Sequence, residues 1–431
     1  MTAPPPGSHA QSTVGAAALA RRITAFAGVP FLSLLAPFIF LPVLARHAGA
    51  DVWVAIALGQ SVGGIAALVS GLGYSTLAPP FVAVASIEER RRLLATSLHV
   101  RVPVWSVAAL IAVIVAASLA PEANRAEAAT MAGAMSLAGL APTWFWIGVG
   151  RAMPILWSEV LPRMAATLAA TGLLLLGAGP IWYPILLAIA MIVGPAVVYS
   201  RIASAELVDV DRDGVIGVLR QHPPALIAEI AGGAYNALAV AVVTSVAPVA
   251  QAARFVSGDK AYRFGQYSVS ALGNALQGWV VEAGPARMGR RLRVVIALHL
   301  SVGVAGLVAM GVGGPWLTTA LFGTDVAVGE ATALGFGVAI LGITLGTAFG
   351  RIGLITIGAR KAFMSCVVGA SIVGVTGLLV GASLWGASGA AWALGITEVL
   401  SAAAQGTVLA VLWRRRQRTD QPPTHAPTAT A

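Results

Sequence analysis

Long apolar segments with almost no charge alternate along the chain with short gaps that hold most of its basic residues. A helix needs about 20 apolar residues to cross the hydrocarbon core of a bilayer. Spanning backbone must also satisfy its polar groups internally, which favours helices. The pattern therefore predicts an all-α polytopic membrane protein with about 12 transmembrane helices. The predicted spans are 26–45, 53–73, 103–120, 130–148, 155–177, 181–199, 225–246, 264–281, 294–314, 329–349, 363–384 and 389–413.

Basic residues predict the orientation of these spans. The even-numbered gaps and the tails hold most of the arginines, as in Arg90 to Arg92 and Arg414 to Arg416. Short loops rich in Lys and Arg stay in the cytoplasm. We therefore expect a multi-pass protein of the bacterial cytoplasmic membrane with both termini cytoplasmic. The predicted external gaps are too short to hold a catalytic domain.

Composition narrows the classes of function. The chain is 58% hydrophobic and 10% charged, and its net charge of +10 is explained by the cytoplasmic arginines. We therefore expect no nucleic-acid partner. The single Cys366 excludes a disulfide within the chain and a metal site built on cysteines. No Gly-Lys-Ser/Thr sequence occurs, which excludes a P-loop ATPase. We predict no enzyme activity, no cofactor and no metal site.

The spans divide into two sets around a polar segment that contains Asp209, Asp211 and Asp213. A solvated linker is favoured there over a metal-binding pair of carboxylates. The sequence predicts two six-helix bundles around a central cavity, an arrangement typical of transporters built from repeats. The predicted parts are a disordered tail (1–22), the first bundle (23–202), a cytoplasmic linker (203–223), the second bundle (224–413) and a basic, disordered tail (414–431).

Four motifs, in order, resemble those of Wzx-type polysaccharide flippases of the multidrug/oligosaccharidyl-lipid/polysaccharide (MOP) superfamily. They are Pro37-Phe-Ile-Phe-Leu-Pro-Val-Leu-Ala-Arg-His-Ala-Gly49, Ser70-Gly-Leu-Gly-Tyr74, Pro142-Thr-Trp-Phe-Trp-Ile-Gly148 and Leu321-Phe-Gly-Thr-Asp325. The chain departs from the family at Ile147, where a polar or basic residue is common, and at Val52-Trp53, which replaces a Tyr-Gly pair.

This resemblance implies that the chain flips an isoprenoid-pyrophosphate-linked oligosaccharide across the membrane for cell-surface polysaccharide synthesis, by alternating access. The implied partners are the lipid-linked glycan, membrane lipids and other envelope polysaccharide assembly proteins. An ion-coupled multidrug or metabolite antiporter of the same superfamily is the alternative, and coupling to Na⁺ or H⁺ stays open. A third reading is a scaffold without transport activity.

Charges at membrane depth are costly, so each one is a candidate for a functional site. Glu159 and Arg163 lie four residues apart and share a helix face. They form either a self-neutralising pair or a phosphate site in which Glu159 holds Arg163 in place. The resemblance favours the phosphate site, since similar flippases commonly carry a basic residue there.

The eighth predicted span carries a basic cluster at its external end, against the general charge pattern. A polar stripe of Gln266, Ser270, Asn274 and Gln277 follows at helical spacing. Such a face lines water or protein rather than lipid, although interfacial snorkelling of the basic residues is an equal alternative. The substrate-binding candidates are therefore Arg163, Arg254, Lys260, Arg263, Asn274 and Gln277.

Two further acidic and polar pairs are candidates for the cavity or for ion coupling. Glu229 and Asn236 share a face, and Glu229 is either a protonatable coupling group or a carboxyl capped by a neighbour. Glu398 and Gln405 also lie seven residues apart, where helix packing is favoured. The coupling or cavity candidates are Glu159, Glu229, Asn236 and Glu398.

Overall fold

The computed structural model describes residues 37–203, 235, 237–281 and 284–419. All regular structure within these residues is helical. Seven of the described helices are long and apolar enough to cross a membrane, so the chain is a multi-pass membrane protein. They are Gly49–Gly71, Ile87–Leu119, Glu122–Val149, Trp182–Ile202, Arg287–Gly311, Glu330–Leu354 and Arg360–Arg416.

The described N-terminal half begins with helical residues 37–47. A capping box opens its longest helix, because the side chain of Ser86 accepts from the Glu89 amide and the Glu89 carboxylate accepts from the Ser86 amide. The numbered helices of this half are α2 (Gly49–Gly71), α3 (Tyr74–Val84), α4 (Ile87–Leu119), η1 (Glu122–Asn124), α5 (Arg125–Ser136), η2 (Leu137–Leu140), α6 (Thr143–Val149), α7 (Met153–Ile155), η3 (Leu156–Val160), α8 (Leu161–Leu175) and α9 (Trp182–Ala203).

The C-terminal half includes helical residues 237–246 and a long, relatively polar helix, α12 (Val249–Val281). Gly386 interrupts the last element with φ 57 and ψ −137, so α16 contains two helices joined at a kink. The remaining helices are α13 (Gly284–Gly311), α14 (Gly314–Phe322), α15 (Glu330–Gly346), η4 (Thr347–Leu354) and α16 (Arg360–Thr419).

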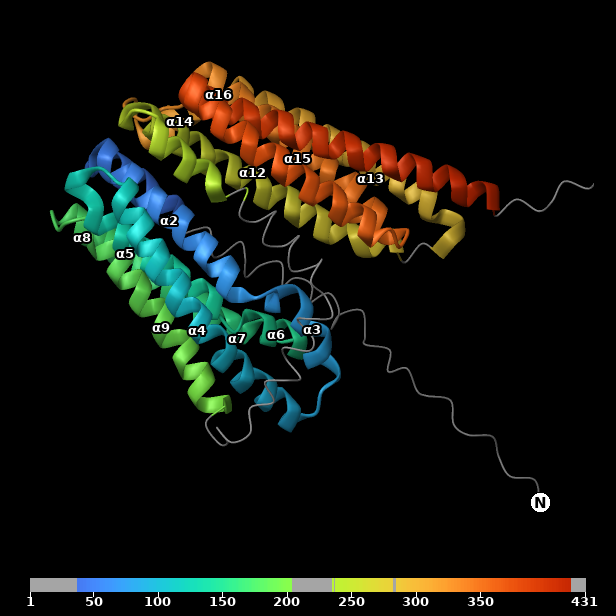
Figure 1. Ribbon diagram of the computed structural model, residues 1–431, viewed down its shortest axis with the longest axis horizontal. Coiled ribbons are helices and arrows are strands. Elements are labelled where there is room, and N and C mark those ends of the chain that lie inside the picture. The colour runs from blue at the N-terminus through green and yellow to red at the C-terminus, as the bar shows by residue number, and fades with distance from the viewer. Residues whose placement is uncertain (1–36, 204–234, 236, 282–283, 420–431) are drawn as a thin grey trace, which may run out of the picture.

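The two halves form separate groups of helices (Figure 1). They approach each other where α2 packs against α12. The groups diverge from the end that carries α14 toward the end that carries α3 and the red C-terminal part of α16 (Figure 1). By the predicted topology, the halves meet near the external side and separate toward the cytoplasmic side.

Several details differ from the sequence expectations. The short helices α3 and α14 lie in predicted gaps, and α3 contains Pro79 and Pro80. Helix α16 continues to Thr419, past the boundary predicted at 413. The start of the predicted basic tail is therefore helical. The first and seventh predicted spans lie partly outside the described residues, as do most of the linker 203–223 and the tails, so the count of twelve spans stays a prediction.

Candidate functional site

A polar contact joins the two halves where α2 and α12 meet. Lys260 Nζ on α12 donates a hydrogen bond of 2.6 Å to Gln60 Oε1 on α2. No ion pair to Lys260 is present among the described residues. An amide oxygen satisfies the ammonium group without cancelling its charge, so a positive charge is held at the junction.

Aromatic and backbone contacts also join the two halves. The indole of Trp53 donates a hydrogen bond of 3.2 Å to the Ala253 carbonyl, and its ring lies 5.2 Å from that of Phe322. The rings of Phe38 and Phe264 stack at 4.0 Å. Trp53 is one of the departures from the flippase pattern, and here it connects the two halves.

The predicted basic cluster on α12 does not act as one group. Arg263 Nε lies 2.8 Å from Asp259 Oδ2, and Asp259 is only 2% exposed. This ion pair neutralises a carboxylate that would be costly to bury alone. Arg254 is exposed, while Lys260 faces Gln60. Lys260 therefore differs from Arg263, which is paired with a carboxylate, and from Arg254, which is exposed.

Further along α12, the exposed Asn274 accepts a hydrogen bond from the Arg351 guanidinium of η4. Arg351 also borders a cavity of ≈ 210 Å³ that contains Glu398 and Gln405. Gln277 is half-buried and does not line this cavity. The full lining is Tyr235, Ile343, Gly346, Thr347, Arg351, Phe363, Val367, Ala370, Ser371, Thr397, Glu398, Ser401 and Gln405.

The predicted pair of Glu159 and Arg163 is present in the N-terminal half. Arg163 Nη2 lies 3.7 Å from Glu159 Oε2, and the side chains are 35% and 6% exposed respectively. The Thr143 hydroxyl donates to both carboxylate oxygens, at 2.8 and 2.7 Å. Glu159 is thus fixed by a neutral donor as well as by Arg163, whose guanidinium stays partly accessible.

The sequence interpretation missed a buried arginine near this pair. Arg101 is 1% exposed and donates to the Tyr199 hydroxyl at 2.6 Å and to the Gly139 carbonyl at 2.8 Å. Its guanidinium also lies 5.1 Å from the ring centre of Tyr74. The sequence placed Arg101 in a cytoplasmic gap, two residues before Pro103, and gave no local signal of burial. Arg351 was missed for the same reason.

The described candidates occupy two regions. Arg163 and Glu159 belong to the N-terminal half, whereas Lys260, Asn274 and Glu398 belong to the C-terminal half. No contact described above joins Arg163 or Glu159 to the candidates of the C-terminal half. Glu229 and Asn236 lie outside the described residues.

Comparison with solved structures identifies the fold. An inward-facing multidrug resistance MATE family transporter of the MOP superfamily aligns with a TM-score of 0.66 at 14% identity, covering 90% of this chain and 96% of that chain. The lipid II flippase MurJ, in an inward closed conformation, aligns with a TM-score of 0.63 at 12% identity and covers 93% of each chain. The chain has the fold of MOP-superfamily transporters.

An outward-facing MATE transporter of the MOP superfamily aligns with a TM-score of 0.53, below the 0.66 of the inward-facing one. No protein-family model and no curated protein matches the sequence. The low identities to the solved structures indicate the fold and leave the substrate to be argued from the residues of this chain.

Proposed function

We propose that the chain translocates an isoprenoid-pyrophosphate-linked oligosaccharide across the bacterial cytoplasmic membrane by alternating access. Such a transporter must move a charged pyrophosphate and its sugars through the apolar interior of the membrane. A transporter for it needs cationic groups whose charge is not already cancelled by carboxylates. Flipping breaks no covalent bond, so the proposed activity needs no catalytic residue.

The proposal rests on the hydrogen-bond partners of two basic side chains, Lys260 and Arg351. Lys260 bonds to the amide of Gln60, and Arg351 bonds to the amide of Asn274. Amides orient a cation and leave its charge available to a phosphate, whereas a carboxylate would compete with the phosphate. Arg163 is a third candidate, because 35% of its side chain stays exposed beside the buried Glu159.

The arrangement of the two halves supports entry of the substrate from the cytoplasmic side. The halves meet through Gln60, Trp53 and their partners on α12 near the predicted external side. They diverge toward the predicted cytoplasmic side (Figure 1). In the proposed cycle, the glycan enters from the cytoplasmic leaflet, and the halves then separate at the Lys260 junction to release it outside.

Deletion of the gene in its bacterial host tests the proposal. We expect loss of one surface glycan, accumulation of its lipid-linked precursor and restoration of export by the wild-type chain. Arg351→Gln should restore export poorly at normal protein abundance, because glutamine keeps a hydrogen-bond donor but lacks the positive charge of arginine. Unchanged surface glycans and no accumulated precursor would contradict the proposal.

An ion-coupled antiporter is the second candidate, and the cavity around Glu398 favours it. Glu398 is half-buried beside Tyr235, Thr397 and Gln405, so it could carry a proton or a Na⁺ ion between two conformations. This reading predicts that Glu398→Gln abolishes Na⁺- or H⁺-driven efflux of a cationic dye. Dye efflux that depends on Glu398, with no effect of the deletion on lipid-linked glycans, would favour the antiporter.

A further inference from the structure

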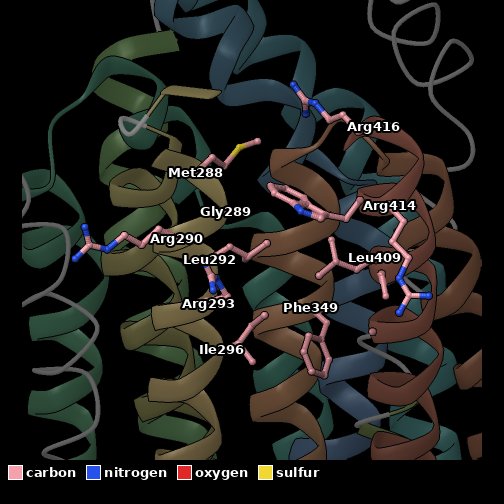
Figure 2. Close-up of a pocket in the computed structure, with 13 residues that line it drawn as sticks. Met288, Gly289, Arg290, Leu292, Arg293, Ile296, Phe349, Leu409, Arg414 and Arg416 are labelled. Atoms are coloured by element: carbon pink, nitrogen blue, oxygen red, sulfur yellow. The ribbon is translucent and has the colours of Figure 1, made fainter. Parts of the chain in front are cut away.

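A second pocket, of ≈ 820 Å³, lies between the start of α13 and the end of α16, and its lining shares no residue with the Glu398 cavity. Figure 2 shows Arg290 and Arg293 on the α13 side and Arg414 and Arg416 on the α16 side. The predicted topology puts this pocket at the cytoplasmic surface. Its lining is Met288, Gly289, Arg290, Leu292, Arg293, Ile296, Phe349, Gly406, Leu409, Ala410, Trp413, Arg414 and Arg416.

The charge of the pocket has one sign, since four of these lining residues are arginines and none is acidic. Arg290, Arg293 and Arg414 are exposed, and none of them makes a hydrogen bond or ion pair within the described residues. Arg92 lies 3.5 Å from the carboxylate of Glu88, whereas Arg91 and Arg360 make no such contact within the described residues. A general excess of cytoplasmic charge explains why arginines occur here, but not why Arg290, Arg293 and Arg414 line one pocket whose described lining holds no acidic residue.

The deeper wall of the pocket is apolar and well formed. A Cβ added to Gly289 would lie 2.8 Å from Cζ2 of Trp413, so the glycine lets the indole pack closely against α13. Phe349 packs in the same way against Gly406, where a Cβ would lie 3.1 Å from its ring. Leu409 is 5% exposed and continues this surface. An indole beside arginines at the end of a spanning helix is typical of the membrane interface.

We propose that this pocket binds an anionic phospholipid of the cytoplasmic leaflet. The arginines of α13 and α16 hold the phosphate from two sides, and the start of an acyl chain lies against Trp413 and Phe349. Basic pockets between helices on the cytoplasmic side suit lipid headgroups, and a polar rim above an apolar wall matches the two parts of a phospholipid. The lipid would join the two helices at the end where the protein halves diverge.

Native mass spectrometry of the full chain, with phosphatidylglycerol or phosphatidylcholine added in detergent, tests the proposal. We expect wild-type protein to retain phosphatidylglycerol preferentially. Arg293→Gln with Arg414→Gln should weaken its binding roughly fivefold for each charge removed, or about 30-fold for both. The matched control is Arg91→Gln with Arg360→Gln, which removes two exposed basic residues that do not line the pocket. The control should bind as the wild type does.

Four results would overturn the assignment. Equal binding of the two lipids would show that the arginines act only as a diffuse surface charge. Equal losses of lipid binding in the test and control variants would show the same. Inorganic pyrophosphate that raises the thermal stability of the protein and displaces the lipid at equal concentration would indicate a site for free phosphate. Displacement by a long-chain polyprenyl pyrophosphate at equal concentration would assign the pocket to the transported substrate. Circular dichroism and gel filtration of each variant check that it is folded.

Discussion

The hydrogen bond between Lys260 and Gln60 should set how tightly the halves close near the predicted external side. It measures 2.6 Å, and its two residues lie 200 positions apart in the chain. A hydrogen bond to a charged group contributes about 1.5 to 3 kcal/mol. If the bond exists only when the halves are closed there, Lys260→Met should shift the ratio of closed to open molecules by roughly 10- to 150-fold.

The two partners should differ in the cost of their removal. Gln60→Leu leaves the Lys260 ammonium without an acceptor at the junction, and an uncompensated buried charge costs about 3 to 5 kcal/mol. Lys260→Met leaves only a neutral amide without a donor, which costs less. The double variant places two apolar side chains in contact, so it should close better than Gln60→Leu alone.

Distances between spin labels at Ala126 and Asp325 measure this closure, in a Cys366→Ser background. Both sites are exposed, and they lie in opposite halves at the predicted external side. We expect one short distance in the wild type and a growing long-distance population in the order wild type, Lys260→Met, Gln60→Leu. Arg254→Gln is the control, because Arg254 is exposed on the same helix and should not change the distribution. Identical distributions in all variants would refute the role of this bond.

Four further predictions concern Arg163, Arg101, Gly63 and the membrane topology. If Arg163 binds phosphate, Arg163→Gln should abolish export at normal abundance even when Glu159→Gln removes its partner; export by the double variant would reject that role. Arg101→Met should lower the free energy of unfolding by about 3 kcal/mol, because buried carbonyls lose their donor, and an unchanged melting temperature would contradict this. Gly63→Ala should destabilise by about 1 to 3 kcal/mol, because its Cβ would overlap the Ala132 carbonyl, whereas Gly64→Ala, which has open space, should not; thermal unfolding compares the pair. An impermeant thiol reagent should label single cysteines only on the predicted external side, and labelling at the cytoplasmic sites would refute the topology; the external sites are Asp51, Ala126 and Gly323, and the cytoplasmic sites are Arg91, Asp211 and Arg290.

The sequence predicted what depends on local spacing. Uninterrupted apolar runs gave the helical fold, and the four-residue spacing of Glu159 and Arg163 predicted their pair, which lies at 3.7 Å. Small residues let helix backbones approach closely. Gly59, beside Gln60, is such a residue, since a Cβ there would lie 2.5 Å from the Ala128 carbonyl of α5.

Contacts between distant segments could not be predicted in this way. No sequence feature close to Lys260 identifies Gln60 as its hydrogen-bond partner. Likewise, no feature close to Arg351 identifies Asn274. The positive-inside rule also assigns an arginine near a helix end to a solvated loop. Arg101 is instead buried among the carbonyls and rings of three other segments, and only the tertiary fold brings those acceptors together.

Reconstitution into lipid vesicles tests the proposed flipping most directly. A fluorescent polyisoprenyl-pyrophosphate oligosaccharide is placed in both leaflets, and an impermeant reductant is added outside. We predict that nearly all fluorescence is lost in vesicles with the wild-type chain, since flipping brings inner molecules to the outer leaflet. Arg351→Gln vesicles should keep about as much of the signal as protein-free vesicles do. Wild-type vesicles that retain the protein-free signal, while they transport a cationic dye along an ion gradient, would contradict the account.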